Sequence, residues 1–337
     1  MKSMDLRTLS EKQSLCTVIK FIAALLVVNG HLFIFGNPTS PLTRFMNFGP
    51  CCVSLFFFLS GYGLIYSYRR NGDAYLKSFF SRRFVKLLIP LAIAYIITLP
   101  IYSLLKAPIN WDEVFSKILW GGPYLKFSWY VTEIAVIYLL FYFTMRLKAQ
   151  LANKLIILSV EVLTLMSILF IANQPIWYIV SLPGFIAGIW YEYFEKRIVS
   201  KISFQSLISV ITTVALVWFI AWQWHYTGDK FLTAYRYEFI SMFLSASLFP
   251  IIVIALTFTA RITPPNLQIT RSFYEVYLLQ NAAMIIASSF TSGFIAYWIL
   301  TMSLILGIAF VAYKIDTVIS GMFTHTCVNV GKTGRGI

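Results

Sequence analysis

The sequence predicts an all-α integral membrane protein: a polytopic transmembrane helix bundle of about ten membrane-spanning helices, with both termini in the cytoplasm. Composition is the first indication. Hydrophobic residues make up 59% of the 337 residues and charged residues only 12%, against about 45–50% and about 25% in soluble domains. So few charges cannot cover a soluble protein of this size. The second indication is that apolar runs of about 20 residues, enough to cross the hydrocarbon core, recur along the whole chain.

Ten such runs follow one another, and we interpret residues 1–337 as a single membrane domain. The first run follows three basic residues, but it is longer than the apolar part of a secretory signal and lacks a small-x-small cleavage site, which predicts a retained span. Two runs are irregular: 176–194 contains Pro183 and Gly184, and 273–290 begins with polar residues. The predicted spans are 15–35, 47–67, 85–105, 128–145, 155–172, 176–194, 205–224, 238–258, 273–290 and 293–313.

The basic residues predict the orientation, because cytoplasmic loops are enriched in Lys and Arg. With the N-terminus inside, 21 of the 27 basic residues lie in cytoplasmic segments. The net charge of +14 is spread over short blocks, without a continuous basic face or a zinc spacing, so nucleic acid is not an expected partner. The four cysteines form no metal-binding pattern, and no metal site is expected. The basic residues in outer segments are Arg44, Lys106, Lys117, Lys126, Lys230 and Arg236.

Two predicted outer loops are longer than a simple turn. They cover residues 106–127 and 225–237. Each either contributes to an outward-facing substrate site or is a solvated connector, and the sequence does not decide between the two.

An ionisable side chain inside the first predicted span is the strongest functional signal. Charged and titratable groups are costly within a membrane and usually mark function there. Lys20 and His31 are eleven residues apart, about three helical turns, so both project from one stripe of the helix. Alternatively, Lys20 extends to the inner headgroups and His31 makes an interhelical hydrogen bond.

Basic residues also gather at the cytoplasmic entrance of the third predicted span. Arg82, Arg83 and Lys86 fall within about one turn, and arginine side chains bind phosphate groups well. Orientation of the span by positive charge is the alternative explanation.

Further polar groups lie in or near other predicted spans. Glu133 and Glu275 each need a partner or a wet cavity if they lie in the membrane. Tyr274, Tyr277 and Gln280 are spaced by about one turn, which favours a common polar edge on one helix. Core packing or anchoring at the interface is the alternative for the tyrosines.

Taken in order, these segments resemble those of the membrane acyltransferase-3 family. The stretch from Lys20 to His31 resembles its Arg-x10-His signature, with lysine in place of the usual arginine. Gln280 stands where many members have histidine. The remaining similar segments are Phe56–Gly63 (FFFLSGYG), Arg82-Arg83 with Lys86–Pro90 (KLLIP), Trp129-Tyr130, Phe185–Ile189 and Ser272–Leu278.

The resemblance implies a membrane-bound O-acyltransferase of the cytoplasmic membrane. Its donor substrate is an acyl-CoA, commonly acetyl-CoA, with no permanently bound cofactor, and its acceptor is a hydroxyl of a cell-envelope polysaccharide or lipid-linked glycan. His31 and Lys20 are then the catalytic candidates, and Arg82, Arg83 and Lys86 the candidates for binding the donor. The candidates for binding the acceptor are Ser60, Trp129, Glu133, Tyr274, Glu275, Tyr277 and Gln280.

Two alternatives remain at the level of sequence. A transporter or flippase for a glycan precursor predicts internal repeats and discontinuous helices, but the chain has one clear helix break, at Pro183-Gly184, without an obvious mate in its first half. A catalytically inactive relative is the second alternative, suggested by the substitutions at Lys20 and Gln280.

Overall fold

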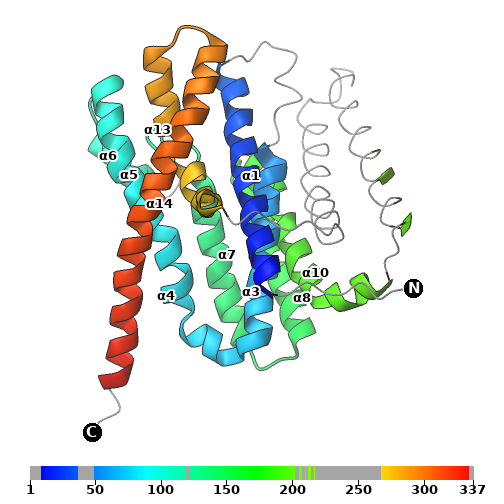
Figure 1. Ribbon diagram of the computed structural model, residues 1–337. Helices are drawn as coiled ribbons and strands as arrows, with labels where there is room; N and C mark the ends of the chain where they lie inside the picture. Colours follow the sequence, from blue (N-terminus) through cyan, green and yellow to red (C-terminus); the bar gives the residue numbers. More distant parts are fainter. Residues whose placement is uncertain are drawn as a thin grey trace. The chain divides into compact units, whose positions relative to one another are not determined.

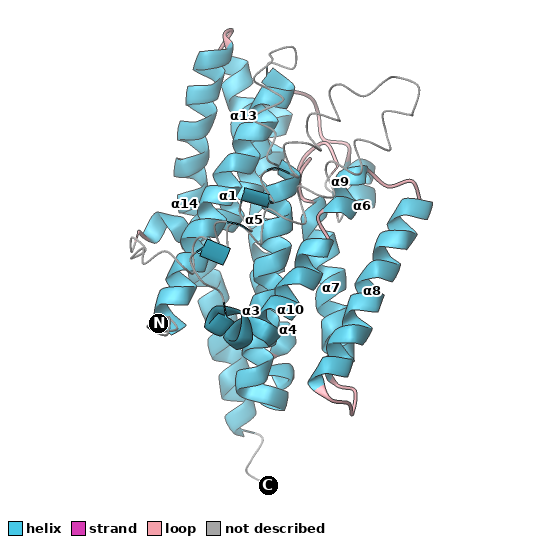
Figure 2. Ribbon diagram, turned by 90° about the vertical axis from the view of Figure 1, so that its right-hand side faces the viewer, coloured by secondary structure: helices cyan, strands magenta, loops and turns pink. Residues whose placement is uncertain are grey.

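The computed structural model describes residues 9–36, 49–118, 122–201 and 267–333, with a few single positions between 205 and 216. Side chains are described within these ranges from residue 13 to 198 and from 267 to 322. The regular structure of the described residues is entirely helical, and Figure 2 draws no strand in them.

Long apolar helices dominate the described part of the chain. Five stretches are long and apolar enough to cross a bilayer, and α7 (Trp129–Met145) is a shorter apolar helix. The protein is therefore an integral membrane protein, and the membrane region of its described residues is helical. The five stretches are formed by α1 (Leu9–Gly36), α3 (Gly49–Lys77), α4 (Phe79–Arg83) together with α5 (Val85–Leu105), α8 (Leu151–Ile171) and α14 (Phe294–Thr333).

Several helices differ in length from the predicted spans. α5 matches its prediction, whereas α3 and α14 continue well past residues 67 and 313, because hydropathy marks only the apolar part of a helix. α3 contains one non-helical residue, Gly72, at φ 52°. Glycine adopts this positive φ without the steric cost that a Cβ would add.

The predicted span 176–194 is not one helix. It is divided into α9 (Ile176–Val180) and α10 (Pro183–Lys201). Proline at the first position of α10 lacks the amide hydrogen that a continuous helix would need there, but it suits a helix start. The predicted span 238–258 lies outside the described residues, and span 205–224 is described only at a few single positions, so the total of about ten spans stays a prediction.

The chain divides into two compact units. The first comprises residues 1–23, 48–73 and 140–266, and the second comprises 24–47, 74–139 and 267–337. Helix α1 contributes residues to both units, because the division falls between residues 23 and 24.

In the first unit, α3 and α10 approach each other through glycines. Gly184 and Gly188 are one turn apart on α10, and a Cβ at either would overlap the carbonyl oxygen of Ser54 or Phe58 on α3. Gly61 on α3 is similarly close to the backbone of α10. Small residues at one-turn spacing allow membrane helices to pack backbone against backbone.

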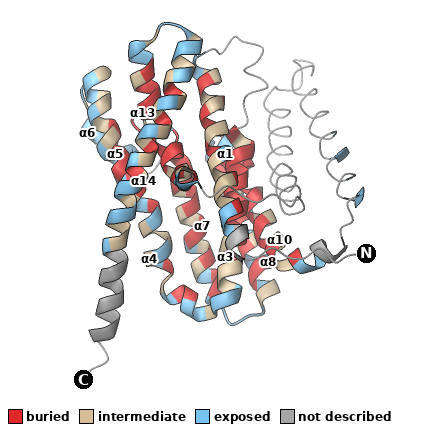
Figure 3. Ribbon diagram, viewed as in Figure 1, coloured by how far each residue is buried: buried red, intermediate tan, exposed pale blue. Residues whose placement is uncertain are grey.

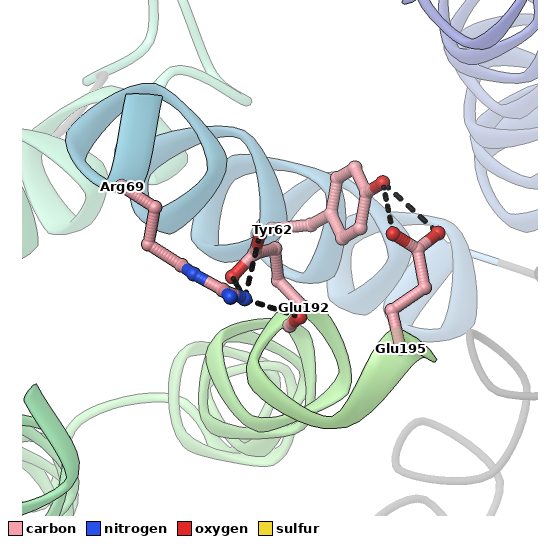
Figure 4. A network of polar contacts seen from close by, with 4 residues as sticks. All are labelled: Tyr62, Arg69, Glu192 and Glu195. Atoms are coloured by element: carbon pink, nitrogen blue, oxygen red, sulfur yellow. Dashed lines mark hydrogen bonds and ion pairs between the residues drawn. The ribbon is translucent and has the colours of Figure 1, made fainter. Parts of the chain in front are cut away.

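The same two helices share buried polar contacts, shown in Figure 4. The Tyr62 hydroxyl donates to the carboxylate of Glu195 at 3.1 and 3.2 Å, and Arg69 pairs with Glu192 at 3.2 Å. Both glutamates are buried, whereas Arg69 is 39% exposed. The Tyr62–Glu195 hydrogen bond is therefore the better shielded of the two contacts.

Replacing Tyr62 with phenylalanine is expected to lower the free energy of unfolding by about 1–2 kcal/mol, because a buried carboxylate loses a hydrogen-bond donor. Tyr66→Phe is the matched control. Tyr66 lies one turn further along α3, and its hydroxyl makes no hydrogen bond to the described residues. The measurement is thermal unfolding of both purified variants in detergent. Equal stability of the two variants would contradict the expectation.

In the second unit, α5, α13 (Phe273–Phe290) and α14 pack against one another (Figure 1). α13 is the most deeply buried of the three, as its colouring in Figure 3 shows.

α6 (Trp111–Lys117) begins at the N-cap Asn110, whose side chain accepts a hydrogen bond from the amide of Glu113. This unit contains most of the predicted site residues.

Candidate active site

The C-terminal half of α1 is fixed against α14. The Trp298 indole donates to the side chain of Asn29 at 2.8 Å, and the rings of Phe33 and Phe294 meet edge to face at 5.0 Å. A buried or half-buried indole N–H normally has such a partner. These contacts determine the rotation of α1 and therefore the direction in which His31, two residues after Asn29, projects.

His31 is partly buried and contacts two elements of the second unit. Its Nδ1 lies 2.7 Å from Oε1 of Gln280 on α13. Its ring stacks on Phe127 with 3.8 Å between centroids and 12° between planes. Phe127 precedes α7 by two residues, at the end of the predicted outer loop 106–127. The imidazole is thus held by one hydrogen bond and one ring face.

The orientation of the Gln280 amide determines which imidazole nitrogen carries the proton. Its Nε2 donates to the carbonyl oxygen of Tyr277 at 2.8 Å, so its oxygen is the atom that faces His31. An amide oxygen only accepts, so Nδ1–H of neutral His31 must be the donor. Nε2 of His31 then has a free lone pair and can act as a base. This tautomer is assigned from the hydrogen-bond network.

Tyr277 connects the two contacts of His31. Its hydroxyl donates to the carbonyl oxygen of Phe127 at 2.5 Å, and its ring meets Tyr130 edge to face at 5.7 Å. One residue of α13 therefore binds the backbone of the residue that stacks on His31, and its own carbonyl orients Gln280.

The predicted polar edge of Tyr274, Tyr277 and Gln280 is divided between two directions. Tyr277 and Gln280 belong to one group with His31 and Phe127, the His31 cluster. The Tyr274 hydroxyl instead donates to the carbonyl oxygen of Leu87 on α5 at 3.1 Å. Tyr274 thus contacts a different helix from the other two.

Two carboxylates of the second unit are buried. Glu133 on α7 is 2% exposed, and neither of its oxygens has a hydrogen-bond partner among the described residues. Glu275 is 4% exposed, and its Oε2 also has no hydrogen-bond partner among the described residues. Trp129, at the start of α7, is also buried. None of the three makes a hydrogen bond to His31.

The three basic residues where α4 ends and α5 starts have different environments. Arg82 and Lys86 are exposed. Arg83 is partly buried, its Nε donates to the Tyr75 hydroxyl at 2.8 Å, and its guanidinium lies 5.9 Å from the ring centroid of Tyr138. Arg82 and Lys86 are therefore accessible to a ligand, whereas Arg83 contributes to packing within the unit.

Lys20 and Ser60 belong to the first unit. Lys20 is partly buried on α1, and Ser60 is 8% exposed on α3. They lie in a different unit from the His31 cluster and stay predicted site residues.

Sequence reasoning missed Phe127 and also Asn281, which follows Gln280. The side chain of Asn281 donates to the carbonyl oxygens of Pro123 and Tyr124 at 3.1 and 2.8 Å, which holds the segment before Phe127 against α13. An aromatic residue at a loop end and a lone asparagine in a span are both common, so neither carried a distinctive signal.

One comparison with known proteins gives a match over most of the chain. The model of the acyltransferase-3 family, described as an acyltransferase domain, matches residues 17–314. This range contains His31 and the residues that contact it, Phe127 and Gln280. No curated protein and no solved structure matches the chain.

Proposed function

Since the chain belongs to the acyltransferase-3 family and is a membrane acyltransferase, we propose that it transfers an acyl group, most simply acetyl, from a cytoplasmic acyl-CoA to a hydroxyl of a cell-envelope polysaccharide or lipid-linked glycan. In this proposal the protein lies in the cytoplasmic membrane with both termini inside. The observation that carries it is the His31–Gln280 hydrogen bond, which leaves Nε2 of His31 available as a base.

The proposed chemistry needs one base at the acceptor. Nε2 of His31 takes the proton from the acceptor hydroxyl as its oxygen attacks the thioester carbonyl carbon. The new C–O bond forms and the C–S bond breaks, releasing CoA as a thiolate. The imidazolium then returns the proton to the thiolate. No external oxidant, reductant or metal enters this balance.

Gln280 supports an active enzyme rather than an inactive relative. Many family members are expected to have histidine at this position, and the amide oxygen of Gln280 accepts a hydrogen bond from Nδ1–H in its place. A carbonyl-type acceptor is a usual second partner of a functional histidine. Gln280 is thus a positioning residue, acting through His31.

Replacing Gln280 with leucine is expected to lower kcat about tenfold, the effect of one lost hydrogen bond on the tautomer and orientation of His31. KM for acyl-CoA should stay unchanged, since the donor does not contact Gln280 in this proposal. The variant Gln280→His, which restores a polar partner, should recover most of the rate. If leucine and histidine variants lose the same activity, the positioning role is wrong.

On the donor side, the exposed Arg82 and Lys86 are proposed to bind the phosphates of the acyl-CoA. Arg82→Gln or Lys86→Gln should raise KM for acyl-CoA about five- to tenfold with kcat unchanged, because each removes a charge-assisted contact made equally in ground and transition states. Arg146→Gln, an exposed cation expected on the same membrane side, is the control. Equal KM values of all three variants for acyl-CoA would contradict donor binding by Arg82 and Lys86.

The test of the function is transfer of radiolabelled acetyl from acetyl-CoA in membranes that contain the protein. Label should reach a carbohydrate fraction with the native chain and not with His31→Ala at matched amounts of protein. Absence of label with both, in the presence of a full set of envelope glycans, would favour a transporter, an inactive relative or another acyl donor.

A further inference from the structure

A pocket lies beside the His31 cluster in the second unit. Its volume is about 590 Å³, within the range of about 300–1,000 Å³ that is usual for small-molecule sites. It is lined by α5, the segment between α5 and α7, and α13. The lining residues are Tyr102, Lys106, Glu113, Lys117, Gly122, Pro123, Lys126, Asn281 and Ile285.

The charged groups around this pocket are mainly cationic. Three lysines line it against a single carboxylate, Glu113, which pairs with Lys117 at 2.8 Å. Lys106 donates to the Ser288 hydroxyl at 3.2 Å, and Lys126 lies 3.8 Å from the ring centroid of Phe35. Neither Lys106 nor Lys126 has a carboxylate within 4 Å in the described part of the chain. Two exposed positive charges are therefore available to a ligand.

The pocket is connected to His31 through two pairs of consecutive residues. Lys126 lines the pocket and Phe127 stacks on His31; Asn281 lines the pocket and Gln280 hydrogen-bonds His31. Asn281 also holds the 123–124 backbone, so the two pairs are fixed to each other. The pocket and the contacts of His31 are thus built from the same two segments of the chain.

We propose that this pocket binds the anionic group, a carboxylate or a phosphate, of the acceptor glycan, through Lys106 and Lys126. The proposal rests on the proposed function, and it adds the chemical class of the acceptor. The pocket belongs to the segment expected on the outer side, where an envelope glycan is found. Fixing the anion there would bring a neighbouring hydroxyl of the same sugar to His31, and a neutral sugar would lack this anchor.

Binding is measured first, because it does not depend on turnover. The purified full-length protein in neutral detergent is titrated with methyl glucuronide, with glucose 1-phosphate and with neutral methyl glucoside, followed by thermal unfolding. At least one of the two anionic sugars should bind about tenfold more tightly than methyl glucoside. Lys106→Gln and Lys126→Gln should each remove most of this difference, whereas Lys148→Gln, an exposed lysine outside the pocket, should keep it.

An anionic lipid headgroup is the other source of a phosphate. The titrations are therefore repeated in phosphatidylcholine vesicles with and without phosphatidylglycerol. Preference for an anionic sugar in phosphatidylcholine alone supports the acceptor assignment. The assignment is overturned if the two lysine variants lose phosphatidylglycerol binding but keep the sugar preference, or if neither anionic sugar binds better than methyl glucoside.

Transfer of radiolabelled acetyl to the same three sugars separates this proposal from the proposed function. Anion binding without transfer to any acceptor would contradict the function and leave the anion pocket standing. Transfer to methyl glucoside at a kcat/KM equal to that for both anionic sugars would overturn the pocket proposal and leave the acyltransferase intact.

Discussion

Replacing His31 with alanine is expected to lower acyl transfer by about 10²–10⁴-fold, the usual contribution of a general base. The loss should fall on kcat and on kcat/KM equally, because proton transfer to Nε2 occurs only in the transition state. The measurement is the initial rate of acetyl transfer from acetyl-CoA by purified protein, over a range of donor and acceptor concentrations that gives both kcat and kcat/KM.

The matched control for folding is His31→Gln. Glutamine is a polar side chain that can still hydrogen-bond Gln280, but it has no basic nitrogen. Both variants should unfold near the temperature of the native protein, and both should show the same large loss of acyl transfer. Full activity in either folded variant would contradict a base at this position.

Replacing Gly188 with alanine is expected to prevent the close approach of α3 and α10 in the first unit. The new Cβ would overlap the carbonyl oxygen of Phe58, a backbone atom that no side-chain rotation can move aside. Overpacking of this kind costs about 1–3 kcal/mol, and more where the backbone must shift. The expected result is a lower unfolding temperature in detergent and less protein in the membrane.

Gly63→Ala is the control for this prediction. Gly63 also lies in the glycine-containing segment of α3, but among the described residues no atom outside the neighbouring turns of the helix lies within 4 Å of the place that a Cβ would take there. Alanine favours a helix by up to about 1 kcal/mol over glycine, so this variant should be as stable as the native chain or slightly more so. Equal stability of the Gly188 and Gly63 variants would contradict backbone contact at Gly188.

The resemblance at the level of sequence and the match of the family model agree, and both depend on ordered local segments rather than on contacts. The helix lengths show the limit of such local patterns. Hydropathy predicted α5 at its observed bounds, but it did not predict that α3 continues to Lys77. The break expected at Pro183-Gly184 is confirmed, although the sequence left open that a new helix, α10, starts at Pro183. The polar end of a helix has no apolar signal, and a proline is compatible with either a kink or a start.

Two glycines of α3 illustrate the same limit at the level of packing. Gly61 and Gly63 are two residues apart, and from the sequence both have the same interpretation, as small residues that allow a close helix approach. Of the two, Gly61 is the one with α10 against it. Residues two apart on a helix point in different directions, so the position of the neighbouring helix decides which one matters.

Sequence patterns were sufficient to predict that this protein lies in a membrane, that His31 is an unusual group for such a place, and that the chain is similar to an acyltransferase family. These conclusions depend on composition, on runs of contiguous residues and on short ordered segments, all of which are local. Only the packed helices reveal that Gln280, 249 residues away, accepts a hydrogen bond from Nδ1–H, and that Phe127 stacks on the ring. Such pairs depend on the rotation and depth of packed helices, which no local pattern records.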